Sequence, residues 1–500
     1  MKIMRQYKIK FLVGFLAILV FVSCKKHLDK TPYNAIALSE SFQTVKDAKT
    51  WNNGVYSFLR GRVYGIYTFS TDVQGDQLNA TLDFGNRNGS PHRWDFTSDD
   101  YTLRDVWAGY YSAINNLNIQ IAGFAKITPA SNEVPELNRY KGDAYLARAY
   151  YYHQLVQLFA KPFEPATAAS DPGIPLVLEY DVTALPARST VKQVYDQILG
   201  DLGQAKTLLT GVAGAQGSTR FTKDAVSALE ARVKLNMKDW AGAKAAADAV
   251  ISTGTYPLIS TQAALTDYWA KDTKTETILQ LQAIAPNELS NANNIYLGYI
   301  PTTKRYDPDF IPSQWVVDKY AGTDFRKAAY FAQLPVTIQG TNYDNVWLVN
   351  KYPGNSTLFT GANTNYQHSP KVFRIAEMYL ISAEAGARLS GASETDALAK
   401  LNSLRIARGL TALTGLTGNA LIDAIKDERF RELAFEGFRL LDLKRWHEPM
   451  VRHDPQNTNM LATGANYYTL SIPADHPKFV WGIPSNDVTV NKNLQQNSGW

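Results

Sequence analysis

The sequence is poor in the residues that nucleophilic and metal-dependent enzymes most often use. Its 500 residues include a single cysteine, Cys24, so neither an intramolecular disulfide nor a thiolate zinc site is available. The seven histidines contain no pair at the HExxH spacing, and neither a G-x-S-x-G elbow nor a phosphate-binding loop occurs. We therefore expect no catalytic residue, no metal site and no cofactor, and we favour a binding function.

An excess of charge of one sign is also lacking. Lys and Arg together number 51 and Asp and Glu 46, which gives a formal charge of +5. Four of the basic residues precede residue 11, and without that leader the formal charge falls to +1. Nucleic-acid binding needs clustered Lys and Arg to replace phosphate counterions, so we exclude that class of partner.

The N-terminus has the pattern of an export signal. A basic segment is followed by the apolar run "FLVGFLAILVFV", which ends at Ser23. This run is shorter than the roughly 20 apolar residues of a membrane-spanning helix, so we interpret residues 1–23 as a cleaved signal peptide. Ser23 and Cys24 resemble the lipobox of bacterial lipoproteins, in which the cysteine is lipidated and becomes the mature N-terminus. The alternative is ordinary signal cleavage with an unmodified thiol.

Helical periodicity is clear in four segments. Apolar residues recur at steps of three and four in residues 137–158, before a stop at Pro162, and again in residues 189–209 after the capping candidates Ser189 and Thr190. Residues 222–258 predict two short helices joined at Lys238 and Asp239, and residues 371–410 predict another pair with Gly409 at its C-cap. Helix pairs of this kind are typical of tetratricopeptide-like repeats, which stack on a shared core.

Three long segments between the helices, 61–100, 285–315 and 341–370, are rich in Gly, Asn, Pro and aromatic residues. The chain has 10 Trp, 28 Tyr and 21 Phe, more rings than a helical core needs. Loops of this length are either functional or disordered, and the aromatic content argues against disorder. We expect them to form an ordered, irregular surface on a helical frame.

One carboxylate-rich stretch, "IKDERFRELAFEGFRLLDLKRW", invites comparison with acid–base enzymes. Glu428, Glu432 and Glu436 share one face if the whole stretch is helical, but arginines are interleaved with them. Arginine neighbours favour ionised carboxylates, whereas a general acid needs a raised pKa. We expect a structural ion-pair network here, and the same for Glu377 and Glu384.

The aromatic segments carry the chemistry of a sugar site. A pyranose ring has an apolar face that stacks on aromatic side chains and hydroxyl groups that bind Asn, Asp or Arg. Two segments supply both types, and we select as ligand-binding candidates Asp76, Asn79, Arg93, Trp94, Asn294, Tyr296, Tyr299 and Tyr306. The alternative for any single ring is that it holds its own loop against the frame.

Taken in order, several motifs resemble the SusD/RagB family, the nutrient-binding outer-membrane lipoproteins of Bacteroidetes-type bacteria. They are "CKKHLDKTP", "RYKGDAYLARAYYYHQLVQLFAKP", "FRIAEMYLISAEAGARL", "LNSLRIARGL", "IKDERFRELAFEGFRLLDLKRW" and the closing "VWGIPSNDVTVNKNLQQNSGW". The resemblance spans both ends of the mature chain. The motifs are structural, so the ligand-binding candidates come from their place in the loops and not from the family.

The resemblance implies a mostly α fold, with about four tetratricopeptide-like helix pairs in a superhelical frame, long irregular inserted loops and minor β structure. It implies a signal peptide at 1–23, a lipidated arm and first helix at 24–60, an N-terminal SusD-like region at 61–270 and a C-terminal SusD/RagB region at 271–500.

The resemblance also implies a non-catalytic, lipid-anchored protein exposed at the outer membrane. Such a protein captures an oligosaccharide and delivers it to a TonB-dependent, SusC-like barrel transporter. Two alternatives remain open. The protein could act as a lid on the barrel transporter that captures peptides instead of sugars, or it could be a protein-interaction scaffold. A surface glycosidase is disfavoured because the candidate carboxylates of this chain lie among arginines.

Overall fold

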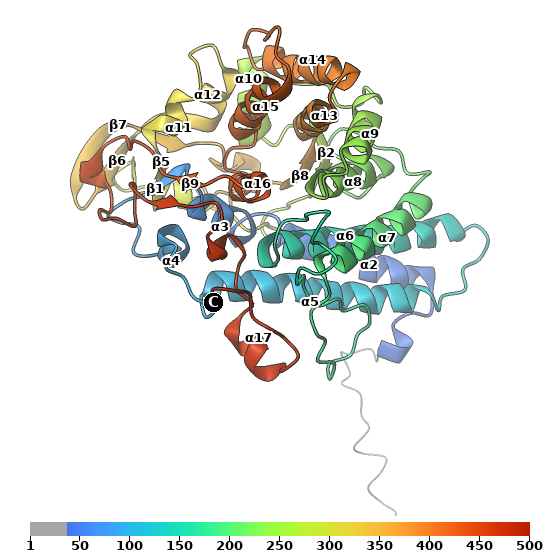
Figure 1. Cartoon of the computed structure of the whole chain (residues 1–500). Coiled ribbons are helices and arrows are strands. Elements are labelled where there is room, and N and C mark those ends of the chain that lie inside the picture. The colour runs from blue at the N-terminus through green and yellow to red at the C-terminus, as the bar shows by residue number, and fades with distance from the viewer. Residues whose placement is uncertain (1–37) are drawn as a thin grey trace, which may run out of the picture.

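Helices dominate the structure, a computed structural model in which residues 38–500 are described (Figure 1). The predicted signal peptide and Cys24 lie outside the described residues. No helix among residues 38–500 combines the length and the apolar character needed to cross a bilayer. The predicted mostly α fold is confirmed, because the β structure is limited to short strands and one hairpin.

The α-helices are α2 (Val45–Arg60), α3 (Ile66–Gln74), α4 (Gly89–Arg93), α5 (Tyr101–Phe124), α6 (Val134–Phe159), α7 (Val191–Leu208), α8 (Lys223–Asn236), α9 (Trp240–Ile251), α10 (Gln262–Ala270), α11 (Gln314–Asp318), α12 (Phe325–Tyr330), α13 (Ile375–Leu389), α14 (Ala392–Ala407), α15 (Gly418–Glu432), α16 (Arg439–Trp446) and α17 (Ser485–Val490). Short 3₁₀ turns are η1 (Leu38–Glu40), η2 (Asn294–Tyr296), η3 (Ser356–Leu358), η4 (Thr458–Met460) and η5 (Pro477–Phe479).

The strands are β1 (Leu78–Ala80), β2 (Thr277–Gln280), β3 (Tyr299–Ile300), β4 (Arg305–Tyr306), β5 (Phe310–Pro312), β6 (Phe331–Ile338), β7 (Thr341–Val349), β8 (Lys371–Arg374), β9 (Met450–Val451) and β10 (Ser471–Ile472). They form three antiparallel two-stranded ladders, β1–β5, β2–β8 and β9–β10, and one four-stranded sheet in the order β3-β4-β6-β7.

The boundaries of α6 and α7 follow from local sequence, as predicted. Pro135 stands in the first turn of α6, where its missing N–H costs nothing, and the helix ends at Phe159, shortly before Pro162. Thr190 caps α7 because its hydroxyl accepts the backbone N–H of Gln193, whose side chain accepts the N–H of Thr190 in return. The two helices pack against each other along their length.

The two other predicted helix pairs are α8 with α9 and α13 with α14. Asp239 caps α9 by accepting the N–H of Gly242, directly after Lys238 makes the turn with a φ of 61°. Gly386 of α13 allows a close approach of α14, since a Cβ there would lie only 3.1 Å from that of Ala397. Gly409 ends the second pair with a φ of 78°, as expected of a C-cap glycine.

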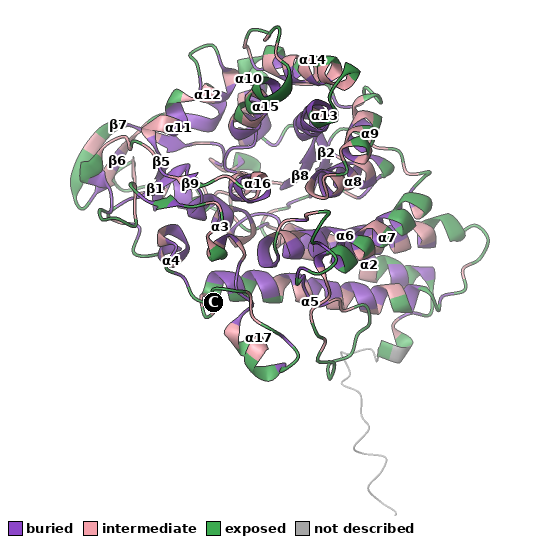
Figure 2. Cartoon of the chain, in the orientation of Figure 1, coloured by how far each residue is buried: buried purple, intermediate pink, exposed green. Residues whose placement is uncertain are grey.

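The helix pairs share one core. Figure 1 shows α2, α5, α6 and α7 as one layer and α8, α9, α13 and α14 beside it, with the β6–β7 hairpin at the opposite edge. α9 also packs on α13, so neighbouring pairs are continuous. Figure 2 shows the buried faces of these helices turned inward. The helical frame therefore leaves the inserted segments at the other side of the molecule.

All three predicted irregular segments contain more regular structure than expected, since segment 285–315 includes β3, β4 and β5. Segment 61–100 includes α3, and segment 341–370 begins with β7. The strand is stabilised by pairing with β6 through a two-residue turn, Gln339-Gly340, with φ angles of 49° and 72°. Both angles are positive, as in the hairpin turns that match strand twist. The prediction missed β7 because its pairing partner, β6, lies outside the segment.

The predicted ion-pair network is confirmed: Glu428 pairs with Arg431 of the same motif, whereas Glu432 has other partners. The Glu432 carboxylate contacts Arg326 at 3.1 Å, Arg374 at 2.6 Å and Arg408 at 2.8 Å, and all four side chains are buried. None of these arginines belongs to the interleaved set of the sequence motif. Glu436 lies beyond the end of α15, so the prediction that three glutamates share one helix face is wrong for this residue.

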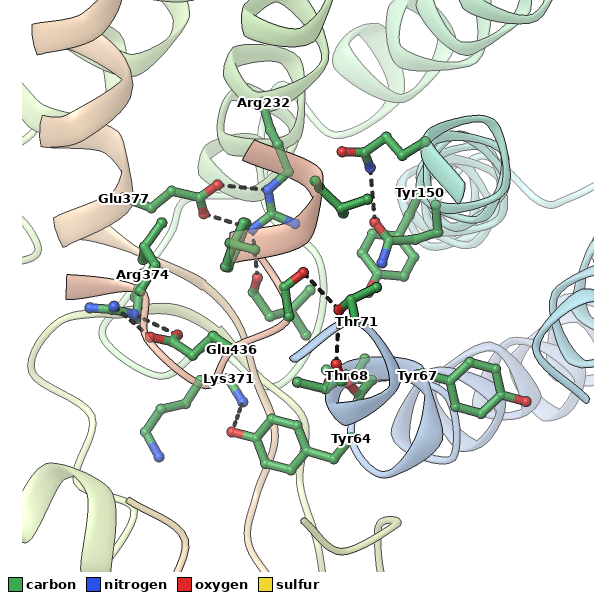
Figure 3. Close-up of a pocket in the computed structure, with 18 of the residues that line it drawn as sticks. Tyr64, Tyr67, Thr68, Thr71, Tyr150, Arg232, Lys371, Arg374, Glu377 and Glu436 are labelled. Atoms are coloured by element: carbon green, nitrogen blue, oxygen red, sulfur yellow. Dashed lines mark hydrogen bonds and ion pairs between the residues drawn. The ribbon is translucent and has the colours of Figure 1, made fainter. Parts of the chain in front are cut away.

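An enclosed polar cavity of about 70 Å³ lies near this network, between α3, α6, α8 and α13. Figure 3 shows Arg232 facing Glu377 and Arg374 facing Glu436 at its wall, where the two closest N···O distances are 2.6 and 2.7 Å. The volume leaves room for a few water molecules and is far below the roughly 300–1,000 Å³ of ligand pockets. We interpret this cavity as a hydrated junction between the frame and the C-terminal half.

Candidate functional site

Two of the aromatic segments meet in space, as the sugar-site prediction requires. β1 pairs antiparallel with β5, which places Asn79 opposite Ile311. The next residue along the chain after β1, Thr81, donates its N–H to Asp309 and also bridges to Leu461. Segments 61–100 and 285–315 are therefore joined by backbone hydrogen bonds, with residues near 460 on their flank.

Several of the selected side chains are buried against the chain itself. Trp94 is 4% exposed and its indole N–H donates to the Gln74 carbonyl at 2.9 Å. Tyr296 is 0% exposed and its hydroxyl donates to Asp72. In this structure neither ring has a face open to a sugar, and both hold their segments against the interior.

The polar candidates divide into two buried side chains and two that reach the surface. Asp76 is buried in an ion pair with Arg439, at 2.6 Å. Asn79 is also buried, and neither polar atom of its side-chain amide has a hydrogen-bond partner among the described residues. Arg93 reaches the surface but pairs with Asp95 at 2.8 Å, and Asn294 is exposed on η2.

The partly exposed candidates are Tyr299 and Tyr306, which face each other on β3 and β4. Their ring centroids are 5.2 Å apart and the planes are tilted by 52°. Tyr366 completes the group, because its hydroxyl accepts the backbone N–H of Tyr299 at 2.6 Å. We call Tyr299, Tyr306 and Tyr366 the tyrosine cluster. The four-stranded sheet fixes it, since Tyr306 pairs with Val336 on β6.

The sequence analysis missed Tyr366, although it lies in the third aromatic segment. The signal was present in "NTNYQH", a tyrosine among turn-forming polar residues, but no motif distinguished it from the chain's other tyrosines. Burial raises the pKa of Tyr366 and of Tyr306, so both phenols stay protonated and able to donate a hydrogen bond at neutral pH. The cluster thus combines ring faces with polar tips.

Acidic residues adjoin the tyrosine cluster in the sequence. Asp307 follows Tyr306, and burial together with the carboxylates of Asp83 and Asp309 raises the pKa of Asp307 to about 6. Arg87 neutralises part of this charge through a hydrogen bond from its Nε to Asp309, at 2.9 Å. The Asp309 carboxylate is buried and Arg87 binds both of its oxygens, so these acidic side chains interact mainly with one another and with Arg87.

The carboxylates of the arginine-rich motif do not have the properties of a general acid. Contacts with arginines hold the pKa of both Glu384 and Glu428 at about 2, despite complete burial of both groups. A general acid at neutral pH needs the opposite shift. In the described part of the chain, no group of three or more His, Cys, Asp or Glu side chains is arranged to hold a metal ion.

Comparison with known families gives two matches that together cover residues 26–500. Residues 236–500 match the SusD family, and residues 26–235 match a family described as starch-binding and associating with the outer membrane. The two matches meet at the end of α8, so no boundary between folded units separates them.

Individual relatives and solved structures agree with these family matches. SusD-like protein P38 of Formosa agariphila is 24% identical, over 91% of this chain and 94% of its own. A SusD superfamily protein from Bacteroides thetaiotaomicron has a TM-score of 0.77 at 24% identity, covering 91% of this chain and 99% of the other. Surface glycan-binding protein A from Bacteroides fluxus has a TM-score of 0.70 at 20% identity, covering 92% and 100%. These likenesses show that the chain shares their fold.

Proposed function

The chain belongs to the SusD family, and from this premise we propose that it is a non-catalytic lipoprotein that captures oligosaccharides at the outer membrane. It would then deliver them to a TonB-dependent, SusC-like barrel transporter. The description of one matching family as starch-binding supports a sugar ligand, as does the name of the glycan-binding protein from Bacteroides fluxus. Cys24, placed directly after the signal run, supports lipid anchoring.

The observation that carries the proposed ligand is the tyrosine cluster. It presents aromatic rings on a rigid sheet, and polar groups lie beside them. Stacking on tyrosine suits the apolar face of a neutral sugar, and the Tyr366 hydroxyl, which accepts the N–H of Tyr299, can donate its proton to a sugar hydroxyl. Of the residues selected from sequence, Tyr299, Tyr306, Asn294 and Arg93 remain ligand-binding candidates, whereas the buried four support the loops.

We expect Tyr306→Ala to weaken glycan binding roughly 10- to 30-fold, the loss of about 1.4–2 kcal/mol that removal of a central aromatic contact produces. The measurement is calorimetric titration of the chain from Lys25 onward against neutral plant, host and microbial oligosaccharides and a peptide digest. Tyr180→Ala is the matched control, because Tyr180 is a 49% exposed tyrosine on a different loop.

An unchanged affinity in Tyr306→Ala, with the glycan still bound by the wild type, would remove the cluster from the site. Binding of the peptide digest and of no glycan would support the peptide-capture alternative. Equal weakening by the Tyr180→Ala control would indicate a general effect of the substitutions on the surface.

A second surface supports the proposed protein partner. Exposed large apolar residues gather on the loop before α7 and on α17, and we call them the apolar ridge: Leu178, Tyr180, Val182, Leu185 and Val490, which are 42–79% exposed. Asn491 and Asn493 bind the backbone of Pro186 and Leu185, at 2.8 and 2.7 Å, and so hold the two segments together. Exposed apolar patches of this kind mark protein contacts.

We expect the double variant Tyr180→Asp/Val182→Asp to reduce recovery of the barrel transporter with this protein at least tenfold. Two charges would have to be desolvated in an apolar contact, which is costly without a partner. Co-purification from detergent-solubilised outer membranes measures this, and Tyr306→Ala should leave recovery unchanged. Full recovery with the double variant would show that the ridge is not the contact.

A further inference from the structure

A groove crosses the end of α16, away from the residues of the tyrosine cluster. It consists of three cavities of about 390, 20 and 280 Å³ whose walls are shared. Lys161, Pro162 and Lys444 line both the first and the small middle cavity, and Asn236 and Arg445 line both the middle and the third. We call this continuous depression the α16 groove.

The groove lies where three parts of the chain meet. The end of α6 and the residues after it form one side, and the turn between α8 and α9 forms another. Residues 474–480 and 497–498 of the C-terminal segment close the first cavity. The volume of that cavity lies in the range of natural ligand sites and that of the third lies just below it. His447 lines both of these cavities, so they adjoin each other at this residue.

The lining is cationic. Its charged residues are Lys161, Lys238, Arg388, Lys444 and Arg445 on the basic side and Asp475 alone on the acidic side. Three of these cations have carboxylate partners within 3 Å that lie outside the lining: Asp171 for Lys161, Glu164 for Lys238, and Glu384 and Asp442 for Arg445. Lys161 remains open to solvent despite its ion pair, because its side chain is 60% exposed, and only Arg388 and Lys444 of this set have no carboxylate partner in the described part of the chain.

Neither Arg388 nor Lys444 has a carboxylate partner among residues 38–500 within 4 Å. Arg388 is exposed, and its guanidinium carbon lies 5.6 Å from the centre of the Trp240 ring. Lys444 is buried and donates to the backbone carbonyls of Gln157 and Ala160, at 2.5 and 2.7 Å. Its burial without a neighbouring anion lowers the pKa of Lys444 to about 7.

Apolar and aromatic groups complete the walls. Trp240 and Trp446 line the third cavity, and Phe479 and Pro477 line the first together with His476. A ligand that fits this combination carries negative charge along a chain whose units also have an apolar face. Arginine recognises carboxylates through paired hydrogen bonds, and the indole beside Arg388 suits a sugar ring.

We propose that the α16 groove is a second binding site, for an acidic oligosaccharide whose sugar units carry carboxylates. Arg388 binds one carboxylate at the Trp240 end, and Lys161 attracts another at the far end. The site is separate from the tyrosine cluster, because none of its three tyrosines lines these cavities. Acidic sugar chains thus bind at the frame and neutral ones at the loops.

The test is calorimetric titration of the chain from Lys25 onward with oligogalacturonate, with its fully methyl-esterified form and with an oligoglutamate peptide. We expect the acid form to bind and the neutral ester to bind at least tenfold more weakly. Affinity for the acid form should fall as salt is raised from low to physiological concentration, because salt screens partly exposed charges. Stronger binding of oligoglutamate would overturn the proposed sugar class.

Variants locate the site. Arg388→Gln and Lys161→Gln should each lower the affinity for oligogalacturonate at least fivefold, and both side chains are exposed enough for the protein to fold normally. Arg104→Gln is the matched control, because Arg104 is an exposed arginine on α5. Tyr306→Ala should leave acid binding intact, which separates this site from the proposed neutral-glycan site. No binding of the acid form, or binding unaffected by Arg388→Gln, would overturn the proposal.

Discussion

Glu432→Gln should lower the free energy of unfolding by about 3–5 kcal/mol, the usual cost of breaking a fully buried ion pair. The wild-type carboxylate is shared by three buried arginines from α12, from the end of β8 and from the end of α14. Glutamine keeps the shape and removes the charge. Each arginine would keep at least one other carboxylate, so the protein should fold but unfold at a lower urea concentration.

The dependence on pH gives this prediction a second readout. Arginine contacts hold the pKa of Glu432 well below its ordinary value of 4.5, even though burial opposes this. A carboxyl with a depressed folded-state pKa stabilises the protein above the unfolded-state value, and that contribution is lost as the pH falls through the folded-state value. The difference between wild type and Glu432→Gln should therefore be constant near neutral pH and shrink below about pH 4.5.

The control is Asp423→Asn on the same helix, because the Asp423 side chain is 74% exposed and its contact with Lys426 is 3.9 Å long. An exposed pair of this kind contributes roughly 0–1 kcal/mol. If Glu432→Gln costs no more than Asp423→Asn in urea unfolding, the buried network does not stabilise the junction of frame and C-terminal half.

Trp94→Ala should cost about 3–5 kcal/mol of stability, as large-to-small substitutions of buried tryptophan do. The ring packs edge-on against Phe479, with centroids 4.9 Å apart, and its N–H is bound to Gln74. Removing it leaves a cavity and an unpaired carbonyl. Urea unfolding of the variant and of wild type measures the loss, and glycan binding by the folded variant should be unchanged.

Trp240→Ala is the matched control for stability, since Trp240 is only partly buried and should cost about 1 kcal/mol. The opposite pattern for Trp94→Ala, unchanged stability with lost glycan binding, would return Trp94 to the ligand site. Stability and glycan binding, measured together, therefore distinguish a ligand-binding role of Trp94, as its sequence context suggested, from a structural role, as its buried position indicates.

The helical frame was predictable because its determinants are local. Thr190 caps α7 through groups three residues apart, and Gly409 ends α14 through its own φ angle. The hairpin of β6 and β7 was missed, since its stability depends on pairing across the turn at Gln339-Gly340. Periodicity within one segment carries no information about such a partner.

The site was only partly predictable. The sequence correctly drew attention to the segments that meet at β1 and β5, and it selected Tyr299 and Tyr306. It also selected Trp94 and Tyr296, which the structure buries, and it did not distinguish Tyr366. Aromatic residues in Asn- and Gly-rich loops have the same composition whether they face a ligand or pack inward.

The sequence alone determined the family, the helix pairs with their caps and the structural nature of the glutamate-rich motif. These depend on residue order and on interactions over a few positions. Only the tertiary structure decided which rings reach the surface, which arginines pair with Glu432, and that Arg388 and Lys161 lie along one groove. Those properties depend on contacts between residues far apart in the chain, and burial is set by what packs against a side chain.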